Sequence, residues 1–162
     1  MTENEQKRCK LVERLGVHLE HKDQMAPVAA RIYSYIILKG RQGTTFEELM
    51  TSLCASKSTI SAHLNHLQDL EKIDYFTKIG DRKKYFILNR NAMIKSINTI
   101  IGQWEDEKQL HHDIMDHKSD INKTLSTEDQ FELKFHQSFI TFLNGAISSI
   151  SELKERIINN NQ

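Results

Sequence analysis

Two segments of the chain concentrate side chains that suit contacts with phosphates and with base edges. The first, residues 56–66, places small hydrogen-bonding side chains and one lysine at helical spacing. The second, residues 80–85, holds a glycine, an aspartate, three consecutive cations and a tyrosine. Cations attract the phosphate backbone, and short polar side chains can approach base edges in the major groove. These residue types predict binding of double-stranded DNA.

The predicted DNA contacts divide by side-chain chemistry. Short polar groups in the first segment suit base edges: Ser58, Ser61, Asn65 and His66. Lysines, a hydroxyl and a phenol suit phosphate oxygens: Lys57, Thr59, Lys83, Lys84 and Tyr85. Ser56 and Lys57 also stand where a helix is expected to begin, and the free backbone N–H groups there favour phosphate. Arg82 is predicted to reach the minor groove or the backbone, because a guanidinium suits a narrow minor groove.

Two short helices joined by a tight turn are predicted to position the first segment. Thr45 and Glu48 form a capping-box pattern that begins one helix, and a short turn through Cys54 and Ala55 follows it. Ser56 is the expected N-cap of the next helix. The apolar stripe of that helix is Ile60, Leu64, Leu67 and Leu70, at spacings of four, three and three. Burial of this stripe turns the polar side chains of the same helix towards solvent.

A β-hairpin is predicted to carry the second segment. Residues 75–79 and 84–88 are aromatic and β-branched runs separated by Gly-Asp-Arg-Lys, which is typical of a hairpin. Gly80 supplies backbone freedom at the tip. Two helices, a turn and a hairpin in this order predict a winged helix-turn-helix, with the hairpin as its wing.

Helices are also predicted before this region. Residues 7–22 have apolar positions at helical spacing, which indicates a first amphipathic helix. Pro27 suits the opening position of an apolar helix over residues 28–38, because its missing N–H costs nothing there. Gly40 and Gly43 are expected to end that helix.

The C-terminal part is predicted to be a helical hairpin that dimerises. Residues 91–122 form one long helical pattern, and Ser126 with Asp129 resembles the N-cap of a last helix. Both helices carry near-heptad apolar stripes. The predicted dimerisation residues are Ile97, Ile101, Trp104, Phe135, Phe139, Phe142 and Ile150. The predicted segments are an N-terminal helix that contributes to dimerisation (1–24), a winged helix-turn-helix domain (25–90) and a helical dimerisation region (91–162).

The charge of the chain is unevenly distributed although its sum is zero. Residues 39–90 hold nine Lys/Arg against six Asp/Glu, a balance of +3, and residues 91–162 hold seven against eleven, a balance of −4. The remaining 38 residues contribute +1. This polarity suggests one face for an anionic polymer and another that is kept off it. An apolar fraction of 38% and a single proline predict a mainly α fold with a small β-hairpin.

Targeting signals and cysteine usage indicate the compartment. No apolar run approaches the ~20 residues of a membrane span, and the polar start does not lead into the apolar core of a signal peptide. Cys9 and Cys54 lie far apart and match no metal or disulfide pattern. We therefore expect the cytoplasm. Cys54 is expected to fill space as a small buried residue, although its position in the turn also allows a redox switch.

The residues that predict the winged helix also resemble a known family. Residues 10–90 resemble a MarR-type winged-helix repressor, and more narrowly its GbsR-like branch. The resemblance rests on Ala30-Arg31-Ile32, on TTFEELMTSLCASKSTISAHLNHLQDLEKI and on Gly80-Asp81-Arg82-Lys83-Lys84-Tyr85-Phe86. It implies a homodimer with its recognition helix in the major groove. Where such domains often have glycine, this chain has Asp74, which is expected to adopt the left-handed conformation. The C-terminal third matches only in helical texture, so the resemblance identifies no effector.

A cluster of histidines and aspartates is the strongest sign of a different chemistry. On a helix, His112 pairs with Asp116 and Asp113 pairs with His117 at i, i+4, a spacing that metals use, and His111 lies beside them. Zinc needs three or four converging ligands, and the sequence fixes no such set. We therefore predict no metal site, no cofactor and no enzymatic activity, and a metal-dependent enzyme is the least favoured alternative.

The sequence as a whole predicts a homodimeric transcriptional regulator, with a repressor favoured over an activator. Two recognition helices are expected to enter major grooves about 34 Å apart on an inverted-repeat operator. A small-molecule effector could release the DNA by favouring another helix arrangement. Trp104 and the phenylalanines of the last helix could line an effector cavity, although aromatics at this spacing more often form an interface. A winged-helix module that binds protein instead of DNA is the main alternative.

Overall fold

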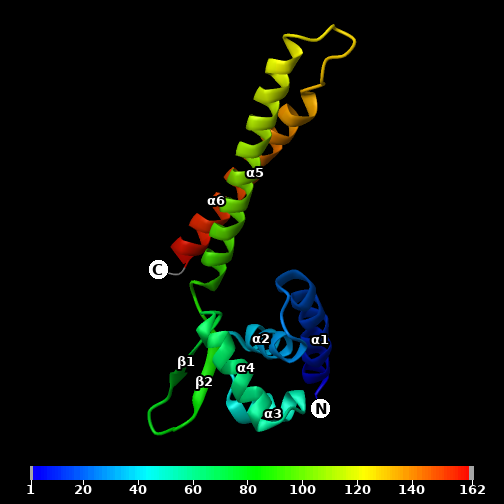
Figure 1. The fold of residues 1–162 in the computed structure, drawn as a ribbon. Helices are drawn as coiled ribbons and strands as arrows, with labels where there is room; N and C mark the ends of the chain where they lie inside the picture. The colour runs from blue at the N-terminus through cyan, green and yellow to red at the C-terminus, as the bar shows by residue number, and fades with distance from the viewer. Residues whose placement is uncertain (1, 161–162) are drawn as a thin grey trace. The chain divides into compact units, whose positions relative to one another are not determined.

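The structure is a computed structural model that describes residues 2–160 (Figure 1). Residues 1, 161 and 162, which belong to the first and last predicted segments, lie outside the described residues. The chain forms two compact units, Met1–Ala92 and Met93–Gln162. The fold is mainly α with one small β-hairpin, which confirms the predicted fold class.

The N-terminal unit contains four α-helices and the hairpin. Its elements are α1 (Glu3–Asp23), α2 (Pro27–Lys39), the 3-10 turn η1 (Gly40–Gln42), α3 (Phe46–Leu53), α4 (Lys57–Asp69), β1 (Ile73–Thr77) and β2 (Lys84–Leu88). α1 begins four residues earlier than predicted, because Thr2 and Glu5 form a complete capping box there. Pro27 opens α2 as predicted, and Gly40 ends it with a φ of 58°.

The helix-turn-helix forms where its caps were predicted. The Thr45 side chain accepts from the Glu48 N–H, and the Glu48 side chain accepts from the Thr45 N–H, which completes the capping box of α3. Cys54 ends α3 in the left-handed conformation, with a φ of 49°. Ser56 caps α4 by accepting from the Thr59 N–H. Local hydrogen bonds of this kind are readable from sequence because each one spans only three residues.

The wing is a two-stranded antiparallel hairpin, and its first strand begins two residues earlier than predicted. β1 covers Ile73–Thr77 rather than residues 75–79, and it pairs with β2 in the register Ile73↔Leu88 to Thr77↔Lys84. Ile79 is fully exposed in the turn instead. Thr44 pairs with Phe86 on the other side of β2, through N–H···O distances of 3.0 and 2.8 Å. β2 is therefore the central strand, and this pairing ties the wing to the start of α3.

Two further expectations about this region are wrong. Asp74 lies inside β1, and the left-handed residue of the α4–β1 connection is Glu71, with a φ of 54°. The chain therefore turns three residues earlier than the resemblance suggested. Leu70 is half exposed, because it ends α4 as the C-cap after the buried stripe has stopped at Leu67.

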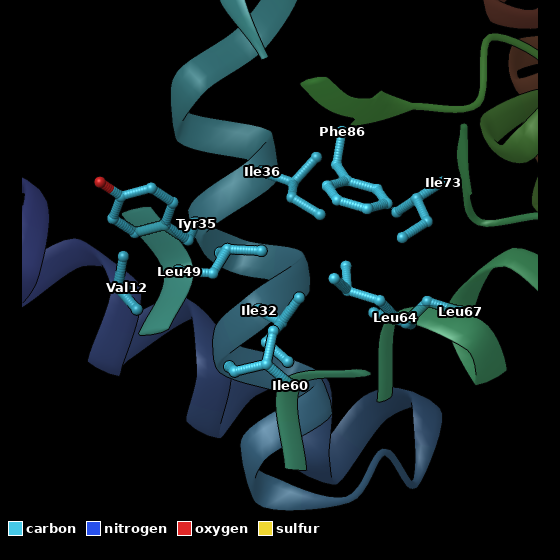
Figure 2. Packing of buried hydrophobic residues seen from close by; sticks show 10 residues of the cluster. All are labelled: Val12, Ile32, Tyr35, Ile36, Leu49, Ile60, Leu64, Leu67, Ile73 and Phe86. Atoms are coloured by element: carbon cyan, nitrogen blue, oxygen red, sulfur yellow. The ribbon is translucent and has the colours of Figure 1, made fainter. Parts of the chain in front are cut away.

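One apolar core holds the N-terminal unit together (Figure 2). Ile32 and Ile36 of α2 are completely buried, as are Leu49 of α3 and Ile60 of α4. Figure 2 shows Phe86 of β2 beside Ile36, so the wing strand also packs on the central helix. Because α4 buries one stripe in this core, its other face is left for solvent or a partner.

The C-terminal unit is an antiparallel pair of long helices, α5 (Ala92–Asn122) and α6 (Lys134–Asn160). Two contacts between the helices show their opposite directions: Asn98 with Lys154, and His111 with His136. Asn122 at the end of α5 accepts from the N–H of Phe131 in the connecting loop. The predicted start of the last helix is wrong. Ser126 Oγ donates to Asp129 Oδ2 at 2.7 Å in a turn of the connecting loop, and α6 begins only at Lys134. None of the helices in residues 2–160 is long and apolar enough to cross a membrane.

Candidate nucleic-acid interface

The exposed face of α4 presents nearly all of the predicted base-contacting and phosphate-contacting side chains of the first segment. Ile60, Leu64 and Leu67 are buried, and most of the remaining positions of the helix are exposed. The exposed polar side chains on this face are Lys57, Ser58, Ser61, Asn65 and His66. Within residues 2–160, the side chains of Ser61, Asn65 and His66 have no hydrogen-bond partner. These groups are therefore available to a ligand.

The start of α4 holds its hydroxyl groups in a local network. Ser56 Oγ lies 3.0 Å from Ser58 Oγ and 2.8 Å from Thr59 Oγ1, besides accepting from the Thr59 N–H. Thr59 is only partly exposed. These hydroxyls orient one another, so the first turn of α4 is ordered before any ligand arrives. Such an order reduces the conformational entropy that binding must overcome.

Asp81 organises the tip of the wing. Its N–H donates to the Lys78 carbonyl at 3.0 Å, and its carboxylate accepts from the Lys83 N–H at 3.0 Å and from the Tyr85 hydroxyl at 2.7 Å. The hydrogen bonds from Tyr85 and from the Lys83 N–H hold the pKa of the Asp81 carboxyl below its usual value. Gly80 has a φ of 79°, which confirms its predicted role at the tip. The loop is therefore a defined turn rather than a loose connection.

Aromatic rings and lysines stiffen the sides of the wing. Phe76 stacks on Tyr85 with ring centroids 5.4 Å apart, and Lys78 Nζ lies 3.9 Å from the centroid of the Tyr85 ring. On the other side of the hairpin, Lys84 Nζ lies 4.1 Å from the Tyr75 ring centroid. Tyr85 was predicted to contact phosphate, and its hydroxyl already donates to Asp81. The structure thus gives Tyr85 a positioning task inside the wing.

Arg82 projects from this ordered turn into solvent. Its side chain is exposed, and in the described part of the chain it makes no hydrogen bond or ion pair. Lys83 and Lys84 beside it are exposed as well. Figure 1 shows the wing tip and the α3–α4 turn at the same end of the N-terminal unit. The two segments selected from the sequence are thus carried by one folded unit.

A cavity of about 440 Å³ between the start of α3 and the wing is lined by three lysines, two of which were not predicted to contact DNA. Lys39 at the end of α2 and Lys78 after β1 line it together with Lys83. Lys39 Nζ forms an ion pair with Glu48 Oε1 at 3.2 Å, so Lys78 and Lys83 supply the excess charge. The Thr44–Phe86 pairing brings these lysines together. Since that pairing is not local, no spacing in the sequence indicated it.

The histidine and aspartate cluster of α5 is arranged differently from the predicted pairs. His111 Nδ1 lies 3.0 Å from Nδ1 of His136 on α6, and Asp113 accepts from the Gln109 side chain at 2.9 Å. Among residues 2–160, no three His, Cys, Asp or Glu side chains are placed to hold one metal ion. The cluster therefore contributes one histidine to the contact between α5 and α6.

The predicted dimerisation residues fall into two groups. Ile97 is buried within the C-terminal unit, and Ile101, Trp104, Phe139 and Ile150 are partly buried. Phe135 and Phe142 are 64% and 60% exposed. The first group packs inside the helical hairpin, and the second leaves most of its surface exposed.

Comparison with known proteins places the fold. No protein-family model and no curated protein matches the sequence. A solved structure described as a transcriptional regulator is 20% identical, covers 94% of this chain and 99% of its own, and superposes with a TM-score of 0.52. An S. aureus MepR mutant is 17% identical, covers 90% of this chain and 91% of its own, and has a TM-score of 0.41. An S. aureus MepR–DNA complex is 18% identical, covers 87% of this chain and 90% of its own, and also has a TM-score of 0.41.

The first of these likenesses defines a class of fold. At 20% identity and a TM-score of 0.52, the chain shares the fold of the solved transcriptional regulator over nearly its whole length. The two MepR structures, at 0.41, add no structural argument. The chain is thus a winged helix-turn-helix protein with a long helical hairpin. This fold alone does not determine its function.

Proposed function

We propose that this chain is a transcriptional regulator that binds double-stranded DNA through α4 and the wing. The observation that carries the proposal is the outward face of α4, where Ser61, Asn65 and His66 stay without partners inside the described chain, together with the exposed Arg82 on an ordered turn. Short polar side chains on a helix suit base edges in the major groove, and a guanidinium suits the minor groove. The fold-level likeness to a transcriptional regulator agrees with this proposal.

The lysines around the wing supply the phosphate contacts of the proposed complex. Lys57, Lys83 and Lys84 are exposed, and Lys78 joins Lys83 on the cavity beside α3. Contacts of this kind fix the register of a protein on the duplex without reading its sequence. They also make the affinity fall steeply as salt is added.

We further propose a homodimer that binds an inverted repeat and acts as a repressor. Phe135 and Phe142 lie one heptad apart on α6 and are mostly exposed, and exposed apolar patches mark interaction surfaces. A two-fold dimer places two α4 helices in major grooves about 34 Å apart, on a palindromic operator. Repression follows when the bound dimer occludes the polymerase. A small-molecule effector acts by favouring a dimer geometry that does not fit the operator.

The test compares point variants on DNA selected from a random pool by the unmodified protein. We expect Arg82→Ala and Asn65→Ala each to weaken binding by about 1–3 kcal/mol in fluorescence anisotropy, while the dimer stays intact. Arg14→Ala is the matched control, because it removes an exposed guanidinium from α1. Lys83→Ala is expected to reduce the salt slope of the affinity by about 1.

Two outcomes contradict the proposal. If Arg82→Ala and Asn65→Ala both leave the affinity unchanged, the DNA-binding face is wrongly assigned. If the random pool yields no enriched sequence and binding to DNA shows no salt dependence, the proposed function is contradicted and the alternative of a protein-binding module is favoured.

A further inference from the structure

A cavity of about 310 Å³ in the N-terminal unit is lined by both cysteines of the chain. Cys9 reaches it from α1 with Val12 and Glu13, one helical turn further on. Cys54 reaches it from the turn between α3 and α4. The other lining side chains come from α2 and from the end of α3: Val28, Arg31, Tyr35, Ser52, Leu53 and Ala55. Two nucleophilic groups 45 residues apart in sequence thus share one small space.

Contacts to Tyr35 hold the two thiol-bearing segments close to each other. Arg8, next to Cys9 on α1, places its Cζ 5.4 Å from the centroid of the Tyr35 ring. On the other side, the hydroxyl groups of Ser52 and Tyr35 are hydrogen-bonded at 3.1 Å, two residues before Cys54. Both segments therefore meet the same buried side chain of α2.

Both thiols are accessible, which the sequence analysis did not predict for Cys54. Each cysteine is free and exposed. Cys54 does not fill space in the core, because it is the C-cap of α3, with a φ of 49°, and it is exposed at the turn. The Cys54 thiol makes only a long contact, as donor to the Thr51 carbonyl at 3.8 Å. Both thiols are therefore accessible to an oxidant that diffuses from solvent.

The packing of α1 on α2 fixes one wall of the cavity. Arg31 Nη2 lies 3.1 Å from Glu13 Oε2, and a second arm of the same guanidinium contacts Glu20. Gly16 allows this close approach, since a Cβ there would lie 3.3 Å from Arg31 Cγ. The opposite wall is the α3–α4 turn, which ends at the Ser56 cap. A change in the width of the cavity therefore requires the α3–α4 turn to move relative to α1.

We propose that Cys9 and Cys54 form a dithiol site that a hydroperoxide converts into an intrachain disulfide. One thiolate attacks the peroxide, the O–O bond breaks, and a sulfenic acid and an alcohol form. The second thiol attacks the sulfenic sulfur, forms the S–S bond and expels water. Two thiols lose two electrons, the peroxide gains them, and the two thiol protons end on the alcohol and the water. A thiol reductant reverses the reaction by exchange.

This bond spans the cavity. A disulfide holds its two Cα atoms within roughly 7 Å of each other, so it ties the α3–α4 turn to α1 and fixes the distance between them. α4 begins at Lys57, three residues after Cys54, and its cap at Ser56 moves with the turn. The oxidised protein is therefore expected to bind DNA more weakly. This second consequence rests on the proposed function, whereas the disulfide itself does not.

The experiment treats the purified, reduced full chain with tert-butyl hydroperoxide. We expect the number of titratable thiols to fall from two to zero while the chain stays a single species on a non-reducing gel. Peptide mass spectrometry should show a Cys9–Cys54 cross-link with the loss of two hydrogens. Dithiothreitol should restore both thiols.

A relocated cysteine provides the matched control. The double variant Cys9→Ser/Lys10→Cys keeps two exposed thiols, but position 10 does not line the cavity. It should form no intrachain cross-link at the same peroxide concentration. Free thiols that persist in the unmodified chain, sulfinic acids, or bridges between chains would overturn the dithiol site.

The effect on DNA is measured separately on the selected operator. We expect oxidation to lower the affinity about tenfold in the unmodified chain and to leave Cys9→Ser unchanged. A complete intrachain disulfide with unchanged affinity contradicts the coupling to α4 but not the dithiol site. Failure of the reduced protein to bind any DNA contradicts the proposed function alone.

Discussion

The two units of the chain bury their apolar side chains to very different degrees. In the N-terminal unit, Ile32, Ile36 and Leu49 have no exposed surface, and the core is contiguous from α1 to the wing. In the C-terminal unit, Leu143 is 1% exposed, but Phe135 and Phe142 remain 64% and 60% exposed. The N-terminal unit thus encloses a contiguous core, whereas the C-terminal unit leaves two large aromatic side chains on its surface.

This difference in burial follows from the number of helices and strands that each unit can pack around a core. Four helices and a hairpin can enclose a core from several sides, whereas two antiparallel helices bury only the stripes along which they meet. On α6 that stripe includes His136, Ile140 and Leu143, which face α5. Phe135 and Phe142 form a second stripe. A helix that is apolar on two faces can bury the second face against another neighbour, which is why we propose that this unit dimerises.

The largest expected effect is the loss of a core side chain from the N-terminal unit. Leu49→Ala should lower the free energy of unfolding of this unit by about 2–5 kcal/mol, because Leu49 is completely buried between α2 and α4. The chain has one tryptophan, Trp104, and it lies in the other unit. In urea, the variant should therefore shift the circular dichroism transition and leave the Trp104 fluorescence transition in place. Equal shifts of both signals would contradict the independence of the two units.

A smaller effect is expected from truncation of the second apolar stripe. Phe135→Ala with Phe142→Ala should weaken dimerisation by about 2–4 kcal/mol, since exposed aromatics in an interface carry much of its binding energy. Sedimentation velocity over a concentration series measures the change. Leu70→Ala is the matched control, because it removes a half-exposed apolar side chain from the N-terminal unit. A dimer that survives the double truncation unchanged locates the interface elsewhere.

The same contrast explains how much of the fold was predictable. The caps at Thr45 and Ser56 and the buried stripe of α4 depend on residues three or four apart, so the sequence displays them directly. The start of β1 was wrong by two residues because Ile73 is fixed by its pairing with Leu88 and by burial in the core. Non-local pairing of this kind leaves no period in the chain.

The candidate interface was predictable for the same reason, and its surroundings were not. The outward face of α4 follows from helical periodicity, and the wing follows from Gly80 and the runs beside it. The Cys9–Cys54 cavity joins residues that only the packing of α1 against the α3–α4 turn brings together. The predicted start of α6 was wrong for a different reason: Ser126 and Asp129 do form a hydrogen bond, but it lies within a turn of the connecting loop. An Ser-x-x-Asp pattern caps a helix only when helical residues follow.

The smallest expected effect is a pH dependence confined to the C-terminal unit. His136 is 8% exposed, with Lys118 Nζ 3.1 Å from its Nε2 and His111 Nδ1 3.0 Å from its Nδ1. An ammonium only donates, so His136 Nε2 accepts from Lys118 and its Nδ1–H donates to His111. A second proton on His136 has no acceptor and faces a cation. Burial, Lys118 and His111 together hold the pKa of His136 below its usual value.

The sign of the effect follows from proton linkage. The unfolded chain protonates His136 near its ordinary pKa of about 6.5, whereas the folded unit resists protonation until a lower pH. The unfolded state therefore binds more protons in this window, and stability is full above about pH 6.5 and falls as the pH drops through it to the lowered value. Urea unfolding followed by Trp104 fluorescence at about pH 7.5 and about pH 5.5 should show this loss. His136→Gln should lose less stability between the two values, and His112→Gln, on the same unit, should keep the full difference. If His136→Gln retains the whole pH dependence, protonation of His136 does not cause the loss of stability of the C-terminal unit, and the prediction is wrong.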